Sequence, residues 1–225
     1  MKNDGVSTQV GIILILAIVS LAVALIFSGY KNITDSLIAS NHEKELRNSI
    51  ILLHTNIEKV VFEGVSVRST ELKTYEGYFA IENDSYVIIN NSVTYVGSIY
   101  YKGNSEFSIQ NGGVFANFSG SKIVLIDPPV LSSGNITIFP IIQLTGTGST
   151  SGKGVLRVRV DNLGGGVFES ENRTVQIISR YAALWKEILE KENFQILQSN
   201  ETYVKAEASG KLLVKTALLK IGFLR

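Results

Sequence analysis

The apolar residues of this chain are gathered in one block near the N-terminus. Residues 10–27 read VGIILILAIVSLAVALIF, with thirteen Leu, Ile, Val or Phe residues and no charge. A helix of this length extends about 27 Å, nearly the thickness of the hydrocarbon core of a bilayer. Transfer of these side chains into lipid is favourable by about 5 kcal/mol. A helix buried in a soluble protein normally keeps one polar face, and this segment has none. We therefore expect residues 10–27 to form a transmembrane helix or the core of a helical filament.

A polar stretch follows the apolar block, and apolar positions then return with helical spacing. They recur at intervals of four, three, four and three residues, which places them along one side of a helix. Gly64 is a suitable C-terminal stop. We predict a nearly continuous helix over residues 6–64, although Ser28 and Gly29 leave a kink or a break open. The apolar positions of its second half are Leu46, Ile50, Leu53, Ile57 and Val60.

From residue 65 onward the pattern becomes β. Runs rich in Val, Ile and Tyr alternate with turn residues, and Asn90-Asn91 reads as a hairpin turn because Asn tolerates positive φ. One amphipathic helix is expected over residues 179–192. The predicted fold class is α+β: a long N-terminal α-helix followed by a mainly antiparallel β head domain, residues 65–225, with one late helix. Strands are expected at 74–81, 86–89, 93–101, 122–126, 136–144, 155–160, 194–197, 203–208 and 212–223.

Composition narrows the possible chemistry. Hydrophobic residues make up 45% of the 225 residues, and the net charge is +1. No global field therefore favours nucleic acid or an acidic partner. The chain has no cysteine, which excludes disulfides, thiol catalysis and cysteine metal sites. The two histidines, His42 and His54, both fall on the predicted helix, where we interpret them as surface residues and not as metal ligands or catalytic bases.

The first residues carry a resemblance to a processing signal. A short polar leader ends in Gly5, and Val6-Ser-Thr-Gln-Val-Gly11 leads directly into the apolar block. This arrangement resembles the class III signal peptide of type IV prepilins, and the chain is similar to archaeal type IV pilin-like proteins. The resemblance implies that a prepilin peptidase cuts between Gly5 and Val6, removing the leader, residues 1–5. Bacterial pilins usually carry Glu at the fifth mature position, where this chain has Val10, so the departure points to the archaeal branch.

The resemblance also implies a structural function and its partners. We expect identical subunits in a helical surface filament, matured by prepilin peptidase, assembled by a platform and an ATPase, and used for cell adhesion. The precursor would lie in the cytoplasmic membrane with its N-terminus inside and its head outside. A single-pass, membrane-anchored extracellular binding module that does not polymerise remains an alternative, as does a minor pilin. Small residues expected to let neighbouring helices approach closely are Gly11, Ala17, Ser20, Ala22 and Ala24.

The remaining motifs point to a surface glycoprotein and not to an enzyme. The loop Gly146–Gly154 lacks the spacing and the hydroxyl of a phosphate-binding loop, and Gly164–Gly166 is also interpreted as a loop. We expect no catalytic residue, metal or cofactor. N-glycosylation sequons are more frequent than the roughly 2.6 expected by chance, which favours a glycosylated exterior. The seven sequon residues are Asn32, Asn83, Asn90, Asn117, Asn135, Asn172 and Asn200.

Overall fold

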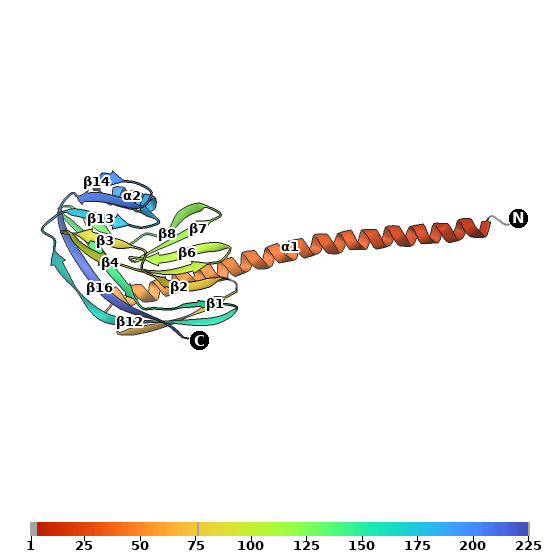
Figure 1. The fold of residues 1–225 in the computed structure, drawn as a ribbon, viewed down its shortest axis with the longest axis horizontal. Coiled ribbons are helices and arrows are strands. Elements are labelled where there is room, and N and C mark those ends of the chain that lie inside the picture. Colours follow the sequence, from red (N-terminus) through yellow and green to blue (C-terminus); the bar gives the residue numbers. More distant parts are fainter. Residues whose placement is uncertain (1–3, 76, 225) are drawn as a thin grey trace. The chain divides into compact units, whose positions relative to one another are not determined.

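The structure is a computed structural model that describes the backbone of residues 4–75 and 77–224 (Figure 1). Side chains are described for residues 10–26, 37, 38, 40–75 and 77–224. The chain divides into two compact units, Met1–Lys44 and Glu45–Arg225. One helix, α1, is assigned to Asp4–Phe62, so its last part belongs to the second unit, which we call the head.

Three sheets and one further helix build the head. Sheet A has the order β1 (Val67–Thr74), β12 (Gly154–Glu169), β16 (Lys211–Leu224), β10 (Ile136–Thr145) and β9 (Leu131–Ser133). Sheet B has the order β11 (Ser149–Ser151), β2 (Tyr78–Glu82), β5 (Ser98–Lys102), β6 (Ser105–Gln110), β7 (Gly113–Phe118) and β8 (Ser121–Ile126). Sheet C has the order β14 (Phe194–Ser199), β15 (Tyr203–Ala208), β13 (Thr174–Ile178), β3 (Tyr86–Ile89) and β4 (Ser92–Tyr95), and α2 spans Ala182–Lys191.

The predicted α+β fold class is wrong, because the chain is mostly β. Sixteen strands accompany two helices in the described part, whereas the sequence patterns predicted nine strands. Several of the strands without a counterpart are short or polar: β9 and β11 have three residues each, and β6 is Ser-Glu-Phe-Ser-Ile-Gln. Pairing with neighbouring strands, more than hydrophobic alternation, stabilises such segments. The expected mainly antiparallel character is confirmed. Every described strand pairing is antiparallel except that of β10 with β16, which is parallel.

The predicted transmembrane helix is corrected as well. Within the described part of the chain, no helical stretch combines the length and the apolar character needed to cross a membrane. The apolar run whose side chains are described covers residues 10–26, which is shorter than the usual span of about 20 residues.

The last part of α1 fills the main core of the head. It runs between sheets A and B, and its apolar seam packs against side chains from both (Figure 1). The predicted seam is confirmed at each position, because all five side chains are at most 5% exposed: Leu46, Ile50, Leu53, Ile57 and Val60. These residues form a helix and a buried stripe because intervals of three and four return to the same side.

A second core lies between sheet C, α2 and the neighbouring ends of β7, β10 and β16. Trp185 of α2 is fully buried there, beside Phe115 of β7 and Phe139 of β10. Phe115 also stacks on Tyr181, with ring centroids 4.9 Å apart. The helix predicted over 179–192 is confirmed as α2, and its apolar stripe faces this core.

Turn chemistry was predicted correctly in one place and incorrectly in another. Asn90 and Asn91 have φ values of 53° and 61° and join β3 to β4, as expected for a hairpin turn. Gly164–Gly166 is not a loop but part of β12, next to a register shift after Asn162. A Cβ on Gly165 would lie 2.1 Å from the carbonyl oxygen of Thr216, so glycine there permits the close approach of β16.

Candidate interaction surface

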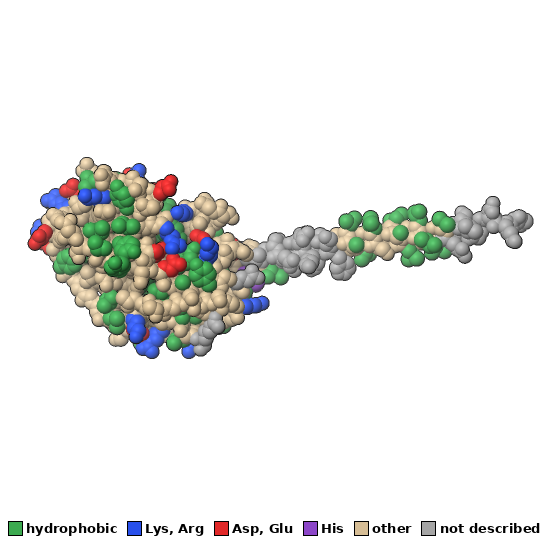
Figure 2. Space-filling view, viewed as in Figure 1, with side chains coloured by type: hydrophobic (Ala, Val, Ile, Leu, Met, Phe, Trp, Pro, Cys, Tyr) green, Lys and Arg blue, Asp and Glu red, His purple; other side chains and the backbone are tan. Residues whose placement is uncertain are grey.

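The described apolar part of α1 exposes hydrophobic side chains in all directions. Between Val10 and Ile26 every residue is exposed, and no residue carries a charge (Figure 2). Twelve Leu, Ile and Val side chains in this segment are each between 47% and 70% exposed. Exposed apolar area on this scale marks a surface that another molecule covers. We call residues 10–26 the apolar segment.

The small residues of the apolar segment lie on two sides of the helix. Ala17, Ser20 and Ala24 are separated by three and four residues, so they share one side. Gly11 and Ala22 are eleven residues apart, about three turns, and share another side. Nine residues, about two and a half turns, separate Gly11 from Ser20, which places the two sides opposite each other. The helix therefore offers two distinct faces for close backbone approach.

Two of the predicted sites fall outside the described side chains. These are the cleavage bond between Gly5 and Val6 and the sequon at Asn32. The other six sequon residues lie in the head, and five of them are in connections between strands. Asn135, Asn172 and Asn200 are exposed. Asn117 differs, because it lies on β7 and its amide nitrogen donates to Glu106.

His54 does not lie on the surface, as the sequence suggested, but is 1% exposed. Its Nε2 lies 2.8 Å from the carbonyl oxygen of Gly112, in the turn between β6 and β7. A carbonyl oxygen only accepts, so Nε2 carries the proton and donates. His54 thereby ties α1 to sheet B. Among the described residues, no group of three or more His, Asp or Glu could hold a metal ion.

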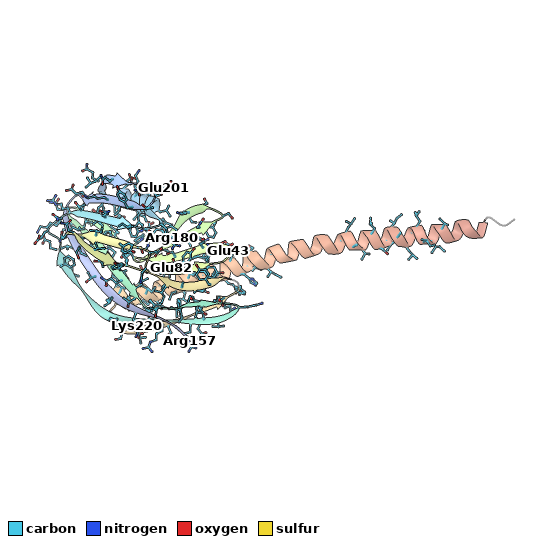
Figure 3. All side chains as sticks on the ribbon, viewed as in Figure 1. Glu43, Glu82, Arg157, Arg180, Glu201 and Lys220 are labelled. Atoms are coloured by element: carbon cyan, nitrogen blue, oxygen red, sulfur yellow. The ribbon has the colours of Figure 1, made fainter. Side chains whose placement is uncertain are left out.

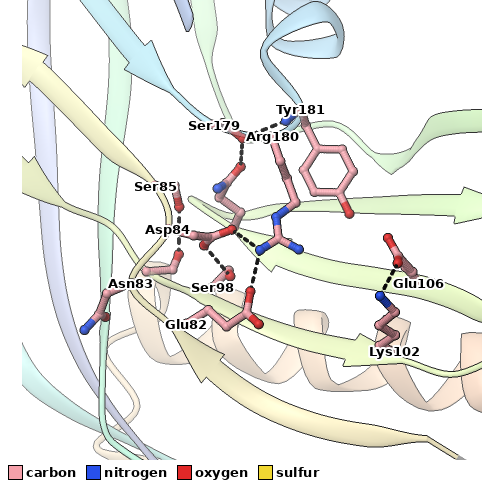
Figure 4. A network of polar contacts seen from close by, with 12 residues as sticks. Glu82, Asn83, Asp84, Ser85, Ser98, Lys102, Glu106, Ser179, Arg180 and Tyr181 are labelled. Atoms are coloured by element: carbon pink, nitrogen blue, oxygen red, sulfur yellow. Dashed lines mark hydrogen bonds and ion pairs between the residues drawn. The ribbon is translucent and has the colours of Figure 1, made fainter. Parts of the chain in front are cut away.

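The most concentrated polar cluster of the head centres on Arg180, in the connection from β13 to α2 (Figures 3 and 4). Its Nη2 lies 2.5 Å from Glu82 Oε2 and 2.8 Å from Asp84 Oδ2. The guanidinium carbon sits 4.5 Å from the ring centroid of Tyr100. Burial alone lowers the pKa of Arg180, but the charges of Asp84 and Glu82 outweigh it, and the pKa is raised. We call Arg180, Glu82 and Asp84 the arginine clamp.

Tyr100, under the arginine clamp, is held in its neutral form. Its burial, together with a hydrogen bond to Glu106, raises the pKa of Tyr100 to about 12. Beside it, Ser179 Oγ and Trp185 Nε1 both donate to Gln110 Oε1, at 2.7 and 3.3 Å. These contacts join sheet C and α2 to sheet B. Ser98 Oγ also donates to Asp84 Oδ1 at 2.8 Å, so the cluster fixes the packing of the head.

Comparison with known proteins identifies the family. Residues 5–216 match the model of a family described as "Family of unknown function (DUF7289)". The chain belongs to this family. The matched range includes the apolar segment as well as nearly all of the head, so the helix is part of what the family shares. No curated protein and no solved structure matches the chain.

The sequence indicated one part of this picture and missed another. The apolar segment was found because its residues are contiguous. The arginine clamp was missed because Arg180 lies 98 positions after Glu82. No local spacing relates the two residues, and only the pairing of β13 with β3 brings them together.

Proposed function

We propose that this protein is a structural subunit of an archaeal type IV pilus-like surface filament, polymerising through the apolar segment. The observation that carries the proposal is the exposure of twelve large apolar side chains around the whole circumference of one helical stretch. Covering half-exposed side chains of this size gains roughly 1 kcal/mol each, so the segment gains on the order of 10 kcal/mol on burial. Identical helices packed against one another provide that cover.

The two small-residue faces support a filament over a closed dimer. A heterologous contact uses two different surfaces of the subunit and continues indefinitely when the rotation does not close. Ala17, Ser20 and Ala24 form one such face of the helix, and Gly11 and Ala22 form the other. Small residues at both faces allow neighbouring backbones to approach and gain dispersion energy. Each subunit then has a neighbour on either side.

The rest of the proposal follows from the resemblance of the N-terminus to prepilins. A prepilin peptidase would release the leader by cutting between Gly5 and Val6, and an assembly platform with its ATPase would add the subunit. The heads would form the exterior of the filament at the cell surface, with glycans at exposed sequons such as Asn135, Asn172 and Asn200. Adhesion is the role we propose for that exterior.

The first experiment uses the full chain expressed with and without active prepilin peptidase. Mass spectrometry of the mature protein should give an N-terminus at Val6 only with the peptidase, and electron microscopy should show filaments only in that case. An intact Met1 and monomeric protein in the presence of the peptidase would instead favour the anchored, non-polymerising module. An intact mass equal to the bare polypeptide would remove glycosylation from the proposal without affecting the filament.

A second experiment tests the two faces. Ala17→Leu and Ala22→Leu each block one face, so each variant alone should form no filament. Mixed together, they should form dimers and nothing larger, because each retains one working face. Leu21 lies between the two faces of the helix. Leu21→Met keeps the side-chain volume at that position, so this control variant should polymerise normally. Filaments from either leucine variant would contradict the two-face arrangement.

A further inference from the structure

The outer face of sheet C carries a row of aromatic and apolar side chains. Tyr95 of β4 pairs with Tyr86 of β3, which pairs with Ile178 of β13, which pairs with Tyr203 of β15. Directly opposite residues of antiparallel strands point to the same side of a sheet. The other side is occupied by core residues such as Val87, so this row faces outward. We call these four residues the tyrosine row.

The tyrosine row is accessible at its β4 end. Tyr95 is 61% exposed, and its ring lies 4.8 Å from that of Tyr86 in an edge-on arrangement. Neighbouring strands are about 4.8 Å apart, so the four side chains of the row extend across the width of four strands. Figure 2 shows hydrophobic side chains over β3 and β4 on the viewed face, separate from the charged side chains near Arg180.

A groove of about 350 Å³ adjoins the row at the free edge of β4. Three parts of the chain meet there: the connection from β2 to β3, strand β4, and the end of β10. None of the lining residues is charged, which disfavours an ionic ligand. The lining consists of Asn83, Val93, Thr94, Tyr95, Gln143, Leu144, Thr145 and Gly146.

The groove offers unused hydrogen-bonding groups. Within the described part of the chain, the side-chain amides of Asn83 and Gln143 make no hydrogen bond. Each amide supplies two donor hydrogens and one acceptor oxygen. Both amides line a groove that an exposed aromatic ring also lines. This combination suits a ligand that has apolar C–H faces and many neutral hydroxyls.

The arginine clamp holds one wall of the groove in place. Glu82 and Asp84 point to Arg180, and Asn83 between them points away from it (Figure 4). The opposite wall is tied by a hydrogen bond from the Leu144 amide to the Val96 carbonyl, at 2.7 Å. A Cβ on Gly97, which has a φ of 66°, would lie 2.6 Å from the Leu144 carbonyl oxygen. The groove is therefore preformed, which reduces the entropy lost on binding.

We propose that the groove and the tyrosine row bind a neutral oligosaccharide or polysaccharide. Tyr95 and Tyr86 stack against the C–H faces of the sugar rings, and Asn83 and Gln143 hydrogen-bond its hydroxyls. The row across sheet C extends the site beyond a single sugar, so affinity rises with chain length. This binding does not depend on polymerisation, and a protein that forms no filament retains it.

The test uses full-length protein made in a host without N-glycosylation, so that Asn83 carries no glycan. The probes are cellohexaose, chitohexaose, maltohexaose and mannohexaose, with hexagalacturonate as the acidic comparison and a six-residue Val/Thr peptide as an extended-strand comparison. Saturation-transfer NMR identifies binding, and calorimetry gives the Kd. At least one neutral hexasaccharide should bind more tightly than its disaccharide, while the acidic saccharide and the peptide should not bind.

Variants of the groove, compared with matched variants elsewhere on the head, separate a loss of binding at this site from a general effect of the substitution. Tyr95→Ala and Gln143→Ala should each weaken binding about tenfold or more, whereas Tyr95→Phe should retain most of it. Leu131→Ala removes an apolar side chain with the same exposure, 61%, on sheet A, and Gln198→Ala removes an exposed amide on β14; neither should change the Kd. Failure of all neutral hexasaccharides to bind at millimolar concentration, equal binding by Tyr95→Ala, or preference for the peptide would each overturn the proposal.

Discussion

Removing the cation of the arginine clamp should destabilise the head far more than removing a comparable arginine from the surface. Arg180 is 35% exposed, and its partners Glu82 and Asp84 are 25% and 23% exposed. Arg180→Ala leaves these two carboxylates close together, partly buried and without a counter-charge. Loss of one partner of a fully buried pair costs about 3–5 kcal/mol, and a surface pair contributes about 0–1 kcal/mol. The loss of the contact with the Tyr100 ring adds roughly 0.5–1 kcal/mol. We expect a loss of about 2–4 kcal/mol.

Arg157 provides the matched control. It pairs with Glu71 at 2.6 Å, but the two side chains are 56% and 59% exposed. Arg157→Ala should therefore cost about 0–1 kcal/mol. The free energy of unfolding is measured by urea denaturation of the full chain in mild detergent. Trp185, the only tryptophan, is fully buried in the second core, so its fluorescence follows unfolding of the head.

Two further variants decide whether uncompensated charge is the cause. Arg180→Ala combined with Glu82→Gln and Asp84→Asn removes the carboxylates that lost their partner, and should recover at least half of the lost stability. Arg180→Lys keeps the charge but not the planar fork, and should be intermediate. Equal losses for Arg180→Ala and Arg157→Ala would refute the reasoning, as would a triple variant no more stable than the single one.

The remaining predictions concern the core, the sheet and high pH. Leu53→Ala should cost about 2–5 kcal/mol by the same urea assay, while Leu52→Ala, at a position that is 53% exposed on the same helix, should cost about 1 kcal/mol or less. Gly165→Ala should lower the melting temperature by several degrees because its Cβ meets the β16 backbone, and Gly222→Ala, with open space around it, should not. Burial and the hydrogen bond to Glu106 raise the pKa of Tyr100 from its usual value of 10.0 to about 12, so its contribution to stability is fully present below pH 10 and is lost as the pH rises to about 12. Tyr100→Phe should flatten stability against pH in that window, and an unchanged slope would contradict the assignment.

The part of the fold that could be predicted is the part encoded by local spacing. The seam from Leu46 to Val60 follows intervals of three and four. Strands β3 and β15 have the predicted bounds because β3 is rich in Val and Ile and β15 alternates apolar residues with residues of the outer face. One available signal was not used. Asn111-Gly112, with φ values of 46° and 77°, joins β6 to β7 and is a common hairpin dipeptide. Recognising it would have added two central strands and moved the predicted class towards β.

Other features depend on contacts that no local pattern encodes. The glycines within β12 look like a loop in the sequence, but they form a strand because β16 approaches closely at Gly165. The tyrosine row joins residues 86, 95 and 203, and it exists only because of the register of four strands. In the sequence the three tyrosines lie in separate segments, and only the pairing shows that they share a face.

The position of Asn83 between the two clamp carboxylates allows stability and binding to be separated. Neighbouring residues of an extended segment point to opposite sides, so directing Glu82 and Asp84 to Arg180 directs Asn83 to the groove. Arg180→Ala should therefore lower both the free energy of unfolding and the saccharide affinity, because the wall that carries Asn83 loses its support. Tyr95→Ala should lower the affinity alone, since its side chain is 61% exposed and lies outside both cores. If Arg180→Ala destabilises the head but leaves the Kd unchanged, the clamp is a packing device only, and the groove owes its shape to the Leu144–Val96 hydrogen bond.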